Sequence, residues 1–159
     1  MRVLVLLCLG IFSSQLFAEQ SPVISTKRLT MEYALKMAQG AINACRQKGI
    51  QVGVTVVDRN GQPQVMLRDV LAPILTAEVS MKKAYTAAMF IAATSALQRQ
   101  AGSSLAHMDN IMFGAGGLPI QAGGEIYGGI GVSGAPDGKD DEKCAQTGIN
   151  SIIEDLELL

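Results

Sequence analysis

The sequence predicts an α+β fold, a single compact domain in which helices pack against a mostly antiparallel sheet. Two observations support this prediction. Segments with apolar residues at helical spacing alternate along the chain with short β-branched segments that are bounded by turns. In addition, ten of the 17 glycines fall between Phe113 and Gly138, where they alternate with isoleucine and valine. Such a mixture is typical of closely packed strands and not of a flexible linker.

The first half of the domain is expected to be a helix followed by a β-hairpin. Apolar residues at helical spacing predict a helix over 30–48, with Thr30 as its N-cap. Alternating β-branched residues predict a strand over 50–57, and the sequence DRNG that follows is a turn. The strand over 65–68 then completes the hairpin.

The second half is expected to be helical, then extended, then helical again. The alanine-rich segment 76–100 predicts one helix or two in succession, with Thr94 and Ser95 as caps of the second. A loop over 102–110 leads into the glycine-rich strands. The segment 140–158 has apolar residues at helical spacing and predicts a closing helix.

The N-terminus has the pattern of a secretory signal over 1–18. An arginine is followed by an apolar run that is too short to span a membrane, and a cleavage site is expected after Ala18. Residues 19–28 form a polar lead-in, and 29–159 form the domain. We therefore expect a periplasmic or secreted protein with no membrane span after cleavage.

The charge and the composition of the chain restrict the classes of macromolecule that it could bind. The formal net charge is −1 and no basic stripe is present, so nucleic-acid binding has no electrostatic support. Aromatic residues are only 4% of the chain, and a core of small side chains favours flat contacts between subunits. We therefore expect a homo-oligomer.

Two cysteines lie within the predicted domain. Cys45 is near the end of the first predicted helix and Cys144 is near the start of the last. Antiparallel packing of these helices would bring the thiols together. A disulfide is typical of an exported protein, and two buried free thiols are the alternative. Neither cysteine has a second ligand at the spacing of a zinc site.

Six motifs occur in consecutive order along the predicted domain: LTMEYALKMAQGAINACRQKG, VTVVDRNG, KKAYTAA, GGLPI, GGIGVSGAP and DEKCAQTGI. In these motifs the chain resembles the GlcG/HbpS family, and the resemblance covers about residues 29–153. The C-terminal domain of PduO-type adenosyltransferases is similar to the same family.

The resemblance implies an α/β sandwich with an antiparallel sheet, and homo-oligomers. It also implies a tetrapyrrole ligand, because some exported members bind haem and modulate a partner sensor system, and PduO-type domains have been linked to haem or corrinoid. Other members are encoded in glycolate-use operons and have no established activity. Haem is therefore the cofactor that the resemblance favours.

Several side chains have the chemistry of haem-iron ligands. His107 is the only histidine and is the candidate metal ligand, with a solvated loop residue as the alternative. Met108 and Met112 carry thioethers, and Tyr85 and Tyr127 could supply a phenolate. Each of the last four residues could instead serve only in packing.

A second group of side chains could hold an anion. If the second helix lies over the sheet, one of the two lysines Lys82 and Lys83 could face the glycine turn at 114–117, and Arg68 ends a strand. Lys83 is favoured because it matches the KA-x-TA motif of the family that the chain resembles. Backbone N–H groups and a cation would there form a pocket for a carboxylate or propionate. The alternatives are that Lys82 and Lys83 form a solvated face with Glu78, and that the glycines serve only strand packing. The residues of the turn and its GGLPI motif that could line this pocket are Gly116, Gly117, Leu118 and Pro119.

Three functions remain open from the sequence. The first is an exported, non-enzymatic protein that binds haem or a related tetrapyrrole for storage, delivery or sensing. The second is an oligomeric accessory protein for an exported enzyme or sensor, without a cofactor. The third is a binder or enzyme of a small carboxylic acid, held by Arg68, Lys83 and the glycine turn.

Overall fold

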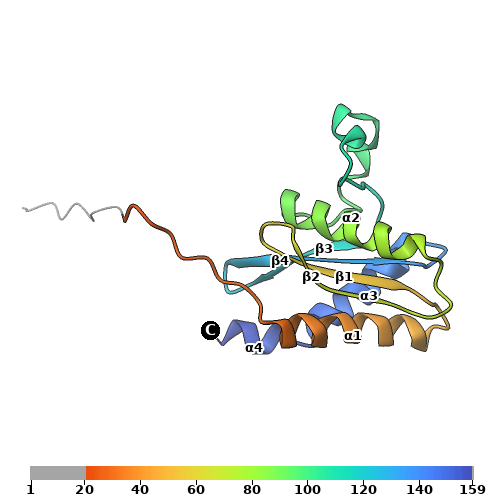
Figure 1. The fold of residues 1–159 in the computed structure, drawn as a ribbon, viewed down its shortest axis with the longest axis horizontal. Coiled ribbons are helices and arrows are strands. Elements are labelled where there is room, and N and C mark those ends of the chain that lie inside the picture. The colour runs from red at the N-terminus through yellow and green to blue at the C-terminus, as the bar shows by residue number, and fades with distance from the viewer. Residues whose placement is uncertain (1–20, 159) are drawn as a thin grey trace, which may run out of the picture.

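The computed structural model describes residues 21–158 and confirms the α+β fold (Figure 1). The predicted secretory signal over 1–18 lies outside the described residues. One antiparallel sheet has the strand order β2-β1-β4-β3. Its strands are β1 (Gly53–Asp58), β2 (Pro63–Arg68), β3 (Gly117–Ala122) and β4 (Glu125–Ser133).

Helices cover both faces of this sheet (Figure 1). The helix α2 (Leu75–Phe90) lies on one face. The helices α1 (Met31–Gln47) and α3 (Gly138–Asn150) lie on the other, together with the short α4 (Ile153–Glu157). Across the described part of the chain, no helix is both long and apolar enough to cross a membrane.

The alternation of side chains along β1 produces the two layers. Val54 and Val56 belong to the main core between the sheet and helices α1 and α3. Thr55 points to the opposite face, where its Oγ1 lies 2.8 Å from Ser80 Oγ of α2. Both faces of β1 are therefore buried, and its residues are mostly β-branched. The buried hydroxyl pair of Thr55 and Ser80 is hydrogen-bonded.

Glycines on β4 allow α2 to lie directly on the sheet. A Cβ atom at Gly129 would collide with the carbonyl oxygen of Ala84, and one at Gly131 would collide with that of Ser80. Gly129 and Gly131 therefore allow close packing of α2 on β4. The sequence left open whether the glycines serve packing or line a ligand pocket, and these two serve packing.

Helix α2 is shorter than the predicted segment 76–100. It ends at Phe90 because Ile91 has a left-handed conformation, with φ of 52°. Thr94 caps no second helix, since its backbone N–H and its hydroxyl are both bonded to Gly117. Residues 97–112, which we call the arm, then project from the α2 side of the molecule (Figure 1). The arm contains two short 3₁₀ helices, Gln98–Gly102 and Ser104–His107.

The predicted closing helix is two helices. The side chain of Asp137 accepts a hydrogen bond from the backbone N–H of Lys139 and caps α3. The chain then bends at Ser151 and Ile152 before α4 begins. The single-helix prediction over 140–158 is therefore wrong at this bend.

A disulfide between Cys45 and Cys144 joins α1 to α3. The two helices run antiparallel, because Lys48 pairs with Asp140 near one end while Lys36 pairs with Asp155 beyond the other. Both cysteines are fully buried. Of the two alternatives that the sequence left open, the structure contains the bridge.

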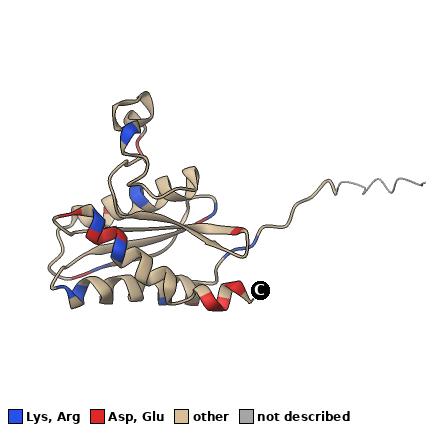
Figure 2. Cartoon of the chain, turned by 180° about the vertical axis from the view of Figure 1, so that it is seen from behind, with Lys and Arg blue, Asp and Glu red and all other residues tan. Residues whose placement is uncertain are grey.

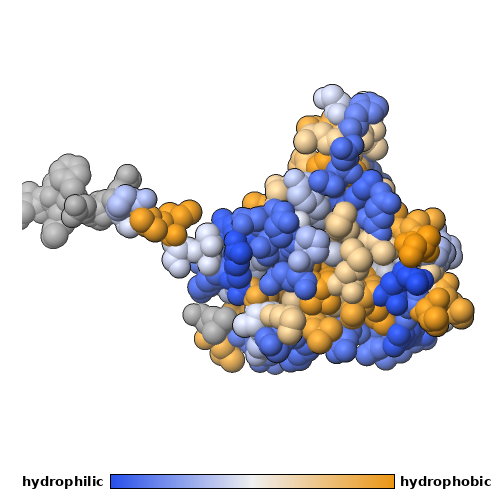
Figure 3. Space-filling view, in the orientation of Figure 1, coloured by the Kyte–Doolittle hydropathy of each residue, from blue (hydrophilic) through white to orange (hydrophobic). Residues whose placement is uncertain are grey.

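The loop between β2 and α2 exposes apolar side chains. Figure 3 shows hydrophobic residues at the end of the molecule where this loop lies. We call this surface the loop patch; it consists of Val70, Leu71, Ile74 and Leu75, each at least 58% exposed. A contiguous apolar patch of this kind is typical of an interaction surface.

Candidate functional site

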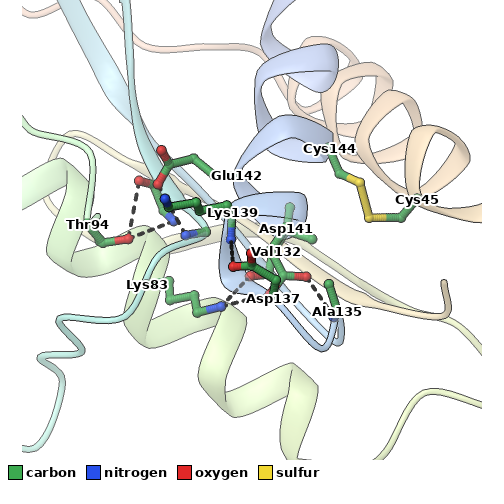
Figure 4. Close-up of polar contacts among 12 residues, drawn as sticks. Cys45, Lys83, Thr94, Val132, Ala135, Asp137, Lys139, Asp141, Glu142 and Cys144 are labelled. Carbon is green, nitrogen blue, oxygen red and sulfur yellow. Dashed lines mark hydrogen bonds and ion pairs between the residues drawn. A yellow bond between two sulfur atoms is a disulfide. The ribbon is translucent and has the colours of Figure 1, made fainter. Parts of the chain in front are cut away.

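Lys83 is buried and holds together three elements of the fold (Figure 4). Its Nζ donates to the carbonyl oxygen of Val132 on β4 at 2.9 Å, and to Asp141 Oδ2 on α3 at 3.0 Å. The other carboxylate oxygen of Asp141 accepts from the N–H of Ala135 at 2.9 Å. Lys83 is 6% exposed and Asp141 is 2% exposed. The predicted solvated lysine face therefore holds for Lys82 alone, which pairs with Glu78 at 2.8 Å.

Burial raises the pKa of Asp141 above its ordinary value of 3.8, and the positive charge of Lys83 opposes this effect. Withdrawal from water disfavours the charged carboxylate, and the lysine recovers only part of that cost. The pair is thus arranged to hold the fold together and not to present a free cation.

The predicted anion pocket at the glycine turn is filled by the protein itself (Figure 4). The N–H of Gly116 donates to Glu142 Oε2 at 3.4 Å, and that of Gly117 donates to Thr94 Oγ1 at 2.9 Å. Gly116 has a φ of 122°, and a Cβ there would lie 2.7 Å from Lys83 Nζ. The glycine is therefore required so that the lysine can lie against the turn.

Arg68 also takes no part in such a pocket. Its guanidinium donates to the carbonyl oxygens of Asp69 and Ala72 and so braces the loop after β2. The structure does not form the predicted pocket of Arg68, Lys83 and the turn, because Lys83 and the N–H groups of Gly116 and Gly117 have partners within the protein and Arg68 bonds to the loop through Nη1.

A different hollow lies between the arm and the body, and we call it the arm hollow. It consists of two adjoining cavities of about 370 and 170 Å³ that share Tyr85 and Asn110. Helix α2 contributes Tyr85, and the arm contributes His107, which is exposed. The remaining lining residues are Gly61, Gln62, Pro63, Met81, Lys82, Met108, Asp109 and Ile111.

The arm hollow gathers side chains that can ligate haem iron. The phenol of Tyr85, the imidazole of His107 and the thioether of Met108 are all known axial-ligand types. Lys82 contributes a cation to the adjoining cavity. The combined volume is in the range of small-molecule and cofactor sites. The donor set of this hollow therefore fits a haem group.

The other predicted site residues lie elsewhere. Met112 is half-buried, and its backbone N–H donates to Thr86 Oγ1. Tyr127 lines a small cavity of about 160 Å³ beside the start of α1. Leu118 and Pro119 line a groove beside β3, which shares no lining residue with the arm hollow. The structure thus brings together Tyr85, His107 and Met108 and separates them from the other candidate residues.

The sequence missed the partners of the buried lysine. Asp141 was not among the candidate site residues, although it lies three residues before the buried Cys144. Because Cys144 is three residues after Asp141 and four residues after Asp140, both carboxylates lie at helical spacing from it, and this spacing does not distinguish them. No sequence signal indicated Thr94 as the partner of Gly117.

Comparison with known proteins gives the family. A family model described as haem degrading protein HbpS-like matches residues 29–150. The chain belongs to the HbpS-like family. This confirms the resemblance that the motifs indicated.

Two curated relatives differ in length. The chain is 31% identical over 133 residues to an uncharacterised 15.0 kDa protein of the dhaT-dhaS intergenic region of Citrobacter freundii, covering 79% of this chain and 93% of that protein. It is 30% identical over 124 residues to the corrinoid adenosyltransferase PduO of Salmonella typhimurium strain LT2. That match covers 74% of this chain and only 37% of PduO.

Solved structures share the fold. A double mutant of Streptomyces reticuli HbpS is 36% identical, with a TM-score of 0.77 and coverage of 87% of this chain and 96% of that chain. A complex of PduOC with heme is 26% identical, with a TM-score of 0.73 and coverage of 79% of this chain and 96% of that chain.

Proposed function

We propose that this member of the HbpS-like family is a haem-binding protein and that the arm hollow is its haem site. One observation carries the proposal: Tyr85 and His107, from different elements, line the same hollow together with Met108. The family description names haem, and the related PduOC structure is a complex with heme. Both support haem as the ligand.

Each residue has a defined part in this proposal. His107 and Tyr85 would hold the iron, and Lys82 would face a propionate. Bound haem would supply a redox-active iron. The exposed position of His107 leaves the site open to a large planar ligand.

We further propose that the protein is exported, non-enzymatic and homo-oligomeric, and that it stores, delivers or senses haem. The Cys45–Cys144 disulfide supports an oxidising compartment, because such bonds are rare in the reducing cytosol. The loop patch supports self-association.

A haemin titration followed at the Soret band tests the haem site. We expect His107→Ala and Tyr85→Phe each to weaken binding by at least about tenfold, as loss of a metal-site contact does. Tyr33→Phe on α1 is the matched control and should bind as the wild type does. Equal titrations for all four proteins would refute the proposed site.

The same experiment separates the alternatives. An accessory protein without a cofactor would give no Soret change in any variant. The small-carboxylate alternative would also give no Soret change, and the pairing of Lys83 with Asp141 disfavours it, because the ammonium already has a partner.

A further inference from the structure

A second hollow, which we call the β3–α3 groove, lies along the edge of the sheet opposite β2. Two adjoining cavities of about 360 and 390 Å³ share Leu118 and Gln146. The walls are the edge strand β3, one side of α3 and α4, and the segment 91–95 that follows α2. The groove contains none of the residues of the arm hollow, so it is a separate site.

The two ends of the groove differ in chemistry. At one end the apolar side chains of Pro119, Ile149 and Ile153 alternate with the amides of Gln121 and Gln146. At the other end stand Lys139 and Lys143, both exposed on the first turns of α3, whose charged residues are visible in Figure 2. The groove thus offers apolar side chains along its length and two lysines at one end, the cationic end.

The cationic end has charge available for a ligand. Among the described residues no carboxylate lies within ion-pair distance of the Lys139 ammonium, and Lys143 pairs only with Asp140, at 3.1 Å. Glu142 also lines this end; it accepts from Ser95 at 2.9 Å and from the backbone of Gly116, and because both donors are neutral it keeps its negative charge beside the two lysines. An anionic head group would nonetheless meet two exposed ammonium groups.

The edge of β3 is closed to an added peptide strand. Gly117 turns its N–H and its carbonyl away from β4, and Thr94 bonds to both. Alternate residues of an antiparallel strand face the same edge, so Pro119 also faces outward and offers no N–H. These are features by which edge strands prevent pairing with another chain. A small molecule is thus a better occupant than an extended peptide.

We infer that the β3–α3 groove binds an anionic amphiphile, a carboxylate with a linear apolar tail. The carboxylate would lie between Lys139 and Lys143, and the tail would run along α3 over Leu118 and Pro119 toward Ile149. The ten helical rises from Lys139 to Ile149 span about 15 Å, which suits a medium-chain fatty acid. Charge complementarity fixes the head, and burial of the tail supplies the main driving force.

Calorimetric titration with decanoate tests this inference on the full domain. We expect decanoate to bind, whereas acetate lacks the tail and decanol lacks the charge, so that both bind more weakly. The double variant Lys139→Gln/Lys143→Gln should weaken decanoate by about fivefold, as expected for two exposed ion pairs. Equal binding of decanol and decanoate would overturn the assignment of the cationic end.

A second variant tests the place of binding. Gln146 is exposed and lines both cavities, so Gln146→Trp should fill the groove and abolish decanoate binding without disturbing the core. Thr147→Trp introduces the same side chain at the adjacent exposed residue, outside the lining, and should bind decanoate normally. Unchanged binding in Gln146→Trp would overturn the inference. So would a change in the oligomeric mass of Gln146→Trp, because a second copy would then occupy the groove.

The inference is independent of the haem proposal. His107→Ala should bind decanoate as the wild type does, and Gln146→Trp should retain the wild-type haemin titration. Loss of decanoate binding in His107→Ala would show that the fatty acid occupies the arm hollow and would overturn the groove site.

Discussion

The substitution Lys83→Met tests whether the buried ion pair holds the domain together. It removes the ammonium that pairs with Asp141, a carboxylate that is 2% exposed, and leaves Asp141 with the hydrogen bond from Ala135. It also leaves the carbonyl oxygen of Val132 without its lysine donor. Removing one partner of a buried pair costs about 3–5 kcal/mol. That is a large share of the roughly 5–15 kcal/mol that stabilises a typical domain.

Urea denaturation followed by circular dichroism measures this cost. The neighbouring Lys82→Met is the matched control: Lys82 pairs with Glu78 at the surface, and its loss should cost less than about 1 kcal/mol. The double variant Lys83→Met/Asp141→Leu replaces both charges by apolar groups and should recover most of the stability. The reasoning is refuted if Lys83→Met costs no more than Lys82→Met, or if the double variant is the least stable of the three.

Three further predictions concern stability. Replacing Cys45 and Cys144 by alanine should lower the free energy of unfolding by about 2–4 kcal/mol, because the bridge closes a long loop in the unfolded chain; equal urea midpoints with and without the bridge would contradict this. Gly131→Ala should destabilise the domain strongly because its methyl group collides with α2, whereas Gly102→Ala meets open space and should be near neutral in the same assay. Because burial raises the pKa of Asp141, the folded state holds that proton more tightly than the unfolded state. As the pH rises from the ordinary pKa of 3.8 through the raised pKa, the free energy of unfolding of the wild type should therefore fall relative to that of Asp141→Asn. Urea titrations at several pH values measure this difference. If the wild type instead became more stable relative to Asp141→Asn over this range, the pKa of Asp141 would be lowered in the folded protein.

The fold was largely predictable because it follows from local periodicity. The helix over 30–48 and the glycine-rich strands both have patterns that survive in the structure as α1, β3 and β4. Several of the predictions that failed concern the segment after α2, where tertiary contacts override the local pattern. Ile91 adopts a left-handed conformation that no sequence rule assigns to a β-branched residue, and Thr94 bonds to Gly117 instead of capping a helix.

The site was predictable in its residue types and not in its arrangement. Tyr85 and His107 were both candidates, but only the path of the arm places them at one hollow. One of the two lysines was expected to face the glycine turn, and Lys83 lies against Gly116. Its partner could not be chosen from the acidic run at the start of α3, because three consecutive carboxylates offer the same chemistry and differ only in the face they occupy.

The location of iron in crystals of the haemin-loaded protein tests the central proposal most directly. Anomalous scattering at the iron absorption edge identifies the metal without reference to the rest of the ligand. We predict one iron peak in the arm hollow, within bonding distance of His107 or Tyr85. An iron peak in the β3–α3 groove, or haemin-soaked crystals with no iron peak near the arm, would contradict the proposed haem site.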